Sequence, residues 1–180
     1  MLLWTGPETL SYPNAVGGPV YRKGDTVVHP EHGAAVIEAL TERDYEGERK
    51  KYLVLRLAYG DLQLMVPVDN TAEVGLRDVV GKAEVKRVLN VLREDESTMA
   101  TNWSRRFKNN IEKLRSGDIY QVAEVVKNLS IRDREKGLSA GEKRMLAKAR
   151  QILVSELVFA LDVEDTDAEE MIDKVLDESH

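Results

Sequence analysis

The first pattern of hydrophobic and polar positions along the chain is strand-like and runs from Gly24 to Val68. Short apolar runs follow one another there, separated by turn-forming residues; they cover residues 26–28, 33–40, 52–57 and 62–66. Tyr45–Glu48 and Tyr59–Asp61 predict two of the turns. Short strands with a turn signal about every 8–12 residues are typical of a small antiparallel barrel or sandwich. Residues 74–80 predict one further strand.

After Gly81 the hydrophobic positions change to a helical period. The first apolar stripe consists of Val85, Val88, Leu89 and Leu92, and the second of Ile119, Val122, Ala123, Val126 and Leu129. A polar and acidic stretch over residues 94–101 predicts a linker between them. Ser139 and Glu142 form a capping box, which predicts the start of a long helix. The acidic tail ends in an amphipathic pattern that predicts one more short helix.

The chain therefore divides into a β part and a helical part, and the predicted fold class is α+β with two domains. Residues 1–20 are rich in Gly, Pro and small polar residues. They predict a disordered arm or a misassigned start, with the true start near Val20. Residues 21–80 predict a small antiparallel β-barrel, and residues 81–100 predict a joining helix and linker. Residues 101–180 predict an all-helical domain.

The composition excludes several classes of protein. With 42% hydrophobic and 32% charged residues among 180, the chain is typical of a soluble folded protein. Because the sequence has no cysteine, it has no disulfide, thiol nucleophile or thiolate metal site. No apolar run approaches the roughly 18 residues of a transmembrane helix, and no secretion signal begins the chain. We therefore expect a cytoplasmic protein that does not bind membranes.

The charge is distributed in three blocks. Residues 1–100 have a net charge of −4, residues 101–150 of +7 and residues 151–180 of −9, within a total of −6. A localised basic block governs association with polyanions more than the net charge of the whole chain does. The block therefore favours contact with nucleic acid, although solvated helix faces of mixed charge would give the same numbers.

The segment Thr101–Lys108 combines an aromatic residue with cations. Thr101 or Asn102 can cap a helix, which places Trp103 in its first turn. The cations beside it are Arg105, Arg106 and Lys108. Such a group suits nucleic acid, because the cations hold phosphates while the ring stacks or wedges between bases. The alternative is a core tryptophan that closes the helical bundle while the arginines reach solvent.

A second basic set lies on the predicted long helix and consists of Lys143, Arg144, Lys148 and Arg150. Arg144 and Lys148 are four residues apart and share a face, which could follow a phosphate backbone. A solvated helix face explains the same pattern equally well.

Evidence for catalysis or metal binding is thin. His29 and His32 flank Pro30 without a third ligand at metal-like spacing, so a turn is the favoured interpretation. The chain has no Gly-rich phosphate loop or nucleophile-elbow pattern, and its paired carboxylates lie in polar runs. We expect neither enzymatic activity, nor a metal, nor a cofactor.

Several motifs together resemble the CarD family of bacterial transcription regulators. In the β part they are residues 23–30 (KGDTVVHP), 32–35 (HGAA), 51–55 (KYLVL) and 60–62 (GDL). In the helical part they are residues 102–108 (NWSRRFK), 117–118 (GD) and 138–150 (LSAGEKRMLAKAR), which are most similar to actinobacterial members. The resemblance covers about residues 21–178.

The resemblance implies a Tudor-like, SH3-like barrel that docks on the β subunit of RNA polymerase. It also implies a helical domain that contacts promoter DNA at the upstream edge of the melted bubble. The DNA-wedging tryptophan of the family falls on Trp103, and the basic residues beside it fall on Arg105, Arg106 and Lys108. We add Lys143, Arg144, Lys148 and Arg150 to the expected DNA-binding set.

On the polymerase side, one docking arginine of the family falls on Arg43. A second falls on Met65, which is not basic. This departure implies either a lower affinity for the polymerase or compensation by Arg56 or Lys51. The expected partners are thus the polymerase β subunit and promoter DNA read with weak sequence preference, by a monomer. The alternative is a protein–protein adaptor whose β part binds a partner without any DNA contact.

Overall fold

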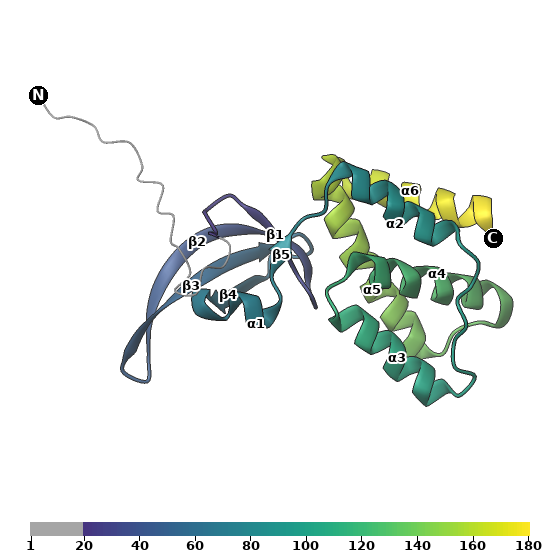
Figure 1. Ribbon diagram of the computed structural model, residues 1–180, viewed down its shortest axis with the longest axis horizontal. Coiled ribbons are helices and arrows are strands. Elements are labelled where there is room, and N and C mark those ends of the chain that lie inside the picture. The colour runs from purple at the N-terminus through teal and green to yellow at the C-terminus, as the bar shows by residue number, and fades with distance from the viewer. Residues whose placement is uncertain (1–19) are drawn as a thin grey trace, which may run out of the picture.

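The computed structural model describes residues 20–180. The N-terminal arm and the start near Val20 that the sequence predicts concern residues outside this range, apart from Val20 itself. Two modules lie side by side in Figure 1, the β module (residues 20–80) at the left and the helical module (residues 81–180) at the right. The chain crosses once between them, immediately after the last strand.

The β module is built on a five-stranded antiparallel sheet in the order β4-β3-β2-β1-β5. Its strands are β1 (Thr26–His29), β2 (Gly33–Tyr45), β3 (Glu48–Leu57), β4 (Gln63–Pro67) and β5 (Arg77–Asp78). The long strands β2 and β3 bend strongly (Figure 1). Buried residues on the inner face, among them Val27, Ile37, Leu53 and Leu55, form its core. The predicted small antiparallel β domain is confirmed.

The strand predicted over residues 74–80 is present as β5, but it is only two residues long. The chain that leads to it, residues 68–76, forms a 3-10 helix, η1 (Val68–Asn70), and a short helix, α1 (Thr71–Val74). Gly75 ends α1 in a left-handed conformation with a φ of 85°, which glycine adopts without steric cost. Apolar side chains in this segment still reach the core, but from helical turns rather than from a strand.

The helical module contains α2 (Lys82–Arg93), α3 (Trp103–Arg115), α4 (Ile119–Lys136), α5 (Ala140–Leu161) and α6 (Asp165–Ser179). All the helices predicted from the apolar periodicity are present. Their buried faces meet in one core, which includes Val122, Leu129, Leu153, Leu157 and Ile172. The predicted α+β fold class with two parts is confirmed.

Helix α2 belongs to this core as well. Its residues Val85, Val88 and Leu92 are buried in the same cluster as those of α4, α5 and α6. In Figure 1 it lies alongside α6. The predicted linker thus corresponds to residues 94–102, which join α2 to α3 without regular structure, and α2 packs as a member of the bundle.

The two modules are docked through the β1–β2 turn and helix α5. The backbone N–H of Ala34 donates to Ser155 Oγ at 2.9 Å. Gly33 leaves the space for this approach, because a Cβ there would clash with that hydroxyl. Pro30, buried in the same turn, lies against Gly117 of the helical module and against Gly75 of its own module. Small residues thus let the turn of one module approach the backbone of the other closely.

Candidate nucleic-acid interface

The side chain of Trp103 lies at the surface of the helical module. Trp103 is the first residue of α3, and its side chain is 47% exposed. The indole stacks on Phe107, one turn further along, with ring centroids 5.0 Å apart and an interplanar angle of 23°. Its Nε1–H donates to Ser139 Oγ at 3.1 Å. The ring therefore rests on the bundle and presents its other face to solvent, instead of closing the core.

Both helix starts around this ring are capped by the residues that the sequence indicates. The Asn102 side chain accepts from the backbone N–H of Arg105 at 3.1 Å, which caps α3. Ser139 and Glu142 form the predicted capping box at the start of α5. These two N-termini are brought together by the tryptophan, which begins the first helix and bonds to the cap of the second.

Arg106 is the one member of the expected cation group that the structure removes from the surface. Its side chain is only 5% exposed, and its Nε donates to Glu142 Oε1 at 2.8 Å. Its Nη1 donates to the carbonyls of Ala100 and Thr101 at 3.1 and 3.2 Å. The expectation of a direct phosphate contact by Arg106 is therefore corrected, because the guanidinium is committed to holding α5 and the preceding linker.

The carboxylate that receives Arg106 is itself 2% exposed. Burial alone would raise the pKa of Glu142, but hydrogen bonds from Arg106 and from the backbone and hydroxyl of Ser139 outweigh it. The pKa of Glu142 therefore lies below its ordinary value, and the side chain is an anion near neutral pH. A buried pair that is hydrogen-bonded at both ends fixes the two helices in one geometry.

The other cations of α3 are exposed. The side chain of Arg105 forms no ion pair with any described residue, and Lys108 has only a long contact of 3.9 Å to Glu112, four residues on. Such exposed helix pairs contribute at most about 0.5 kcal/mol. Both cations can therefore turn to an incoming phosphate at little cost.

The expected cations of α5 divide into two kinds. Lys143 and Arg144 are exposed, and their side chains form no ion pair with the described residues. Lys148 and Arg150 are partly buried, and Arg150 already donates to Asp173 of α6 at 2.8 Å. An open hollow of about 610 Å³ brings Arg144, Lys148 and Arg150 together with Tyr59 of the β module. The acidic α6 thus neutralises one end of the basic set.

Arg43, Arg56 and Met65, the residues expected to contact polymerase, share one face of the sheet. Arg43 lies opposite Lys50, Arg56 opposite Gln63, and Met65 opposite Val54, all on the face turned away from the core. Arg56 is held by Glu38, to which its Nε donates at 2.6 Å. Met65 is 40% exposed on β4, which is an edge strand. Its cross-strand neighbour on β3, Val54, is apolar, so Met65 and Val54 form an apolar pair on this face beside Arg56.

His29 and His32 lie in and beside the β1–β2 turn, as the turn interpretation expects. Their rings are 4.8 Å apart, and His29 Nδ1 accepts from the backbone N–H of Glu31 at 3.1 Å. Burial lowers the pKa of both, and the positive charge of Lys148 lowers it further. Within residues 20–180, no group of three potential ligands is suitably placed for a metal ion.

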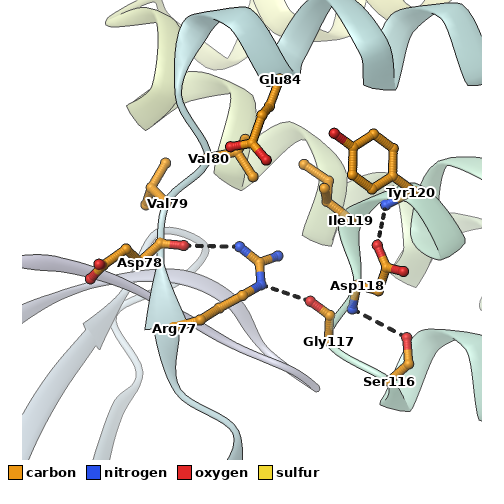
Figure 2. A pocket seen from close by; sticks show the side chains of 10 residues that line it. All are labelled: Arg77, Asp78, Val79, Val80, Glu84, Ser116, Gly117, Asp118, Ile119 and Tyr120. Atoms are coloured by element: carbon orange, nitrogen blue, oxygen red, sulfur yellow. Dashed lines mark hydrogen bonds between the residues drawn. The ribbon is translucent and has the colours of Figure 1, made fainter. Parts of the chain in front are cut away.

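A crevice between the modules is lined by Arg77, Asp78, Val79, Val80, Glu84 and residues 116–120, and has a volume of about 510 Å³ (Figure 2). Arg77 crosses it: Nε donates to the carbonyl of Gly117 at 2.7 Å, and both terminal nitrogens donate to Glu156, at 2.6 and 2.8 Å. Sequence analysis missed this contact, because nothing local links two residues 79 positions apart. The cation in this crevice, Arg77, is therefore already paired with Glu156, and it joins the two modules.

Comparison with known proteins agrees with this arrangement of two modules. Residues 21–80 match the CarD-like/TRCF RID domain, and residues 87–173 match the CarD C-terminal domain. The chain is also 34% identical over 138 residues to the Bacillus subtilis (strain 168) protein named "Putative transcription factor YdeB". That match covers 77% of this chain and 90% of the relative.

The chain belongs to the CarD family. The resemblance that the motifs indicate is confirmed, and the β module is the Tudor-like RID domain of this CarD protein. The CarD C-terminal domain match begins within α2 and extends into α6, and so includes Trp103 and both basic sets. The CarD family is a transcription-factor family rather than a class of enzyme. Within the described part of the chain, no helix is long and apolar enough to cross a membrane.

Proposed function

We propose that this protein docks on the β subunit of RNA polymerase and stabilises the promoter open complex by inserting Trp103 into the DNA minor groove. The insertion point is the upstream edge of the melted bubble. The observation that carries the proposal is the half-exposed indole of Trp103, which lies at the surface beside the exposed cations Arg105 and Lys108. An aromatic wedge flanked by phosphate-binding cations is the chemistry of proteins that unstack a base step.

Docking is assigned to the outer face of the sheet and to its β4 edge. An exposed edge strand can pair with a strand of the partner, so that main-chain hydrogen bonds supply affinity. Arg43 stands on the same outer face and adds a charge for an acidic partner surface. The chain needs no catalytic group for this role.

The close docking of the two modules makes the wedge effective. The contacts of Arg77 with Glu156 and of Ala34 with Ser155 join the polymerase-binding and DNA-binding parts. Once the first part is bound, the second is present near the promoter at an effective concentration that reaches the millimolar range for short connections. Weak contacts from Arg105, Lys108, Lys143 and Arg144 then suffice.

Stabilisation of the open complex follows from differential affinity. Unstacking a base step costs a few kcal/mol in a closed duplex, and less where the strands have already separated. The indole therefore binds the melted edge better than the closed promoter, and only such a difference shifts a two-state equilibrium. Because a wedge senses deformability rather than base identity, sequence preference is weak.

The test of the wedge is the half-life of the polymerase–promoter open complex with Trp103→Ala. Stacking of an aromatic side chain on a base contributes about 1–3 kcal/mol, so we expect a half-life shorter by about 5- to 150-fold. Trp103→Phe keeps a ring and should fall between the wild type and the alanine variant. An unchanged half-life with Trp103→Ala would exclude the wedge.

The test of docking is co-purification with RNA polymerase. Arg43→Glu should weaken it, whereas Lys82→Glu, an exposed change outside the sheet, should not. In a Trp4→Phe chain, where Trp103 is the remaining tryptophan of the two, promoter DNA should quench the fluorescence in a salt-sensitive way. Polymerase binding without such quenching would identify an adaptor that does not contact DNA.

A further inference from the structure

The orientation of the Trp103 side chain is determined by residues of another helix. Its indole N–H is bonded to Ser139, the residue that caps α5, 36 positions along the chain. The same edge of the indole, together with the Phe107 ring, faces Gly141 in the first turn of that helix: a Cβ on Gly141 would lie 3.2 Å from Phe107 Cε2 and 3.8 Å from Trp103 Cζ2. Both rings therefore pack against the N-terminus of α5.

The hydroxyl of Ser139 has all its hydrogen-bonding capacity in use. A serine hydroxyl has one donor and two acceptor positions. The donor goes to Glu142 Oε2 at 3.0 Å, and the acceptors receive the backbone N–H of Glu142 at 3.3 Å and the indole N–H at 3.1 Å. The hydroxyl is therefore held with one lone pair aimed at the indole.

The network closes on itself through the buried ion pair. Glu142 takes the Ser139 hydroxyl on one oxygen and the Arg106 guanidinium on the other. Arg106 follows Trp103 by three residues on α3, so it lies on the same side of the helix. Trp103, Ser139, Glu142 and Arg106 thus form one closed circuit between α3 and α5.

The backbone conformation at position 141 does not require glycine, since the residue lies inside helix α5 and has no positive φ. Alanine is the better helix former at such a position. The space for the two rings is the property that glycine supplies here, because any Cβ would press on Phe107.

We propose that Ser139 and Gly141 are positioning residues for the Trp103 wedge: they fix the indole in the orientation that enters DNA and keep its N–H bonded to the protein. This inference rests on the proposed function. Ordering the ring beforehand removes part of the cost of immobilising a side chain on binding. With the N–H committed, insertion works by stacking alone and does not depend on an acceptor on the base.

The test uses full-length chains carrying Trp4→Phe, in which fluorescence anisotropy and acrylamide quenching report Trp103. Ser139→Gly keeps most of the capping preference but lacks the hydroxyl. Ser139→Thr keeps both, and Asp118→Gly removes the side-chain cap of α4 as a control for lost capping. We expect Ser139→Gly to lower the anisotropy of Trp103 and increase its quenching, with Ser139→Thr and Asp118→Gly close to the parent chain. Gly141→Ala should change both signals by displacing the rings.

The same variants are then compared in the half-life of the polymerase–promoter open complex. Ser139→Gly should shorten it by about 2- to 10-fold, the range expected for one side chain that must be ordered on binding. An unchanged anisotropy, or a changed anisotropy with an unchanged half-life, would overturn the positioning role. If Trp103→Ala itself had no effect on the half-life, the proposed function would fail, and the anisotropy would still decide whether Ser139 holds the ring.

Discussion

Glu156 lies in the C-terminal half of α5, and both of its carboxylate oxygens bind the guanidinium of Arg77 on strand β5. The two hydrogen bonds measure 2.6 and 2.8 Å, and Glu156 is only 1% exposed. The first of these oxygens also accepts the backbone N–H of Val80 at 3.0 Å. One buried anion therefore holds the last strand of the β module and the start of the connection to α2.

Removal of one partner from this pair should destabilise the protein strongly. A buried charge left without its partner costs about 3–5 kcal/mol of unfolding free energy. The loss for Arg77→Ala should be about 3 kcal/mol, because the arginine is partly exposed. Urea unfolding of Arg77→Ala, Glu156→Leu and the double variant measures it. The double variant should be less destabilised than the sum of the two single variants. Lys174→Ala, an exposed ion pair, should cost less than about 1 kcal/mol, and equal losses for Lys174→Ala and Arg77→Ala would contradict the assignment.

Gly33→Ala should destabilise the contact between the modules. Gly33 has a φ of 79°, and its missing Cβ leaves room for the Ser155 hydroxyl. The matched control is Gly47→Ala in the β2–β3 turn, with a φ of 84° and nothing within 4 Å of an added Cβ. Both variants carry the cost of a left-handed alanine, roughly 1–2 kcal/mol, but only Gly33→Ala adds a steric clash of about 1–3 kcal/mol. Equal unfolding free energies for the two variants would show that the β1–β2 turn moves away from α5 without a cost in stability.

Stability should fall as the pH drops below neutrality, because His29 and His32 have lowered pKa values in the folded protein. The unfolded chain binds protons from about pH 6.5 downward, while the folded chain resists protonation until the pH reaches the lower folded values. The stabilisation is therefore complete above about pH 6.5. It is lost as the pH falls from there through the lower folded pKa values.

Urea midpoints between pH 7.5 and 5.5 test this dependence. Lys148 and Arg115 line the same small hollow as His32, with Glu31 as the opposing charge. Lys148→Met should therefore reduce the pH dependence, and replacement of both histidines by glutamine should reduce it more. A slope that persists unchanged in the double glutamine variant would assign it to other groups.

Met65→Arg should strengthen binding to the polymerase β subunit. The CarD resemblance places a docking arginine at this position, and Met65 is exposed on an edge strand, so the longer side chain fits without repacking. One added exposed ion pair contributes about 0.2–1 kcal/mol, equivalent to an increase in affinity of about 1.5- to 5-fold. Titration of polymerase with labelled protein measures the effect, with Ala83→Arg on the exposed side of α2 as the control. A decrease with Met65→Arg would indicate an apolar partner surface.

Much of the fold is predictable from local patterns. Alternation and turn residues locate β1 to β4, and the helical period with Asn102 and Ser139 as caps locates the helices. The segment before β5 escapes prediction because its apolar residues, Val68 and Val74, reach the core from helical turns while following no regular period. Its one clear signal is Gly75, which ends α1.

The sequence predicts which residue types form the candidate site, but it does not predict which of their side chains face solvent. Arg106 follows the same motif as Arg105, but it is buried with Asn110 and Leu114, which share its face at four-residue intervals. That spacing was the available signal, and it competes with the general preference of arginine for the surface. The partner, Glu142, is known locally only as a capping residue. Its pairing with Arg106 depends on how α3 and α5 pack, which no local pattern contains.

The edges of the sheet have a consequence for how copies of the protein behave at high concentration. Unpaired strand edges let identical chains stick together in open-ended assemblies. Here β5 has two residues, and β4 has five and ends at Pro67, which has no N–H to donate. Growth into a fibre would need a longer uninterrupted ladder on both sides. The sheet can thus pair with one incoming strand, but its short edges do not favour open-ended self-association.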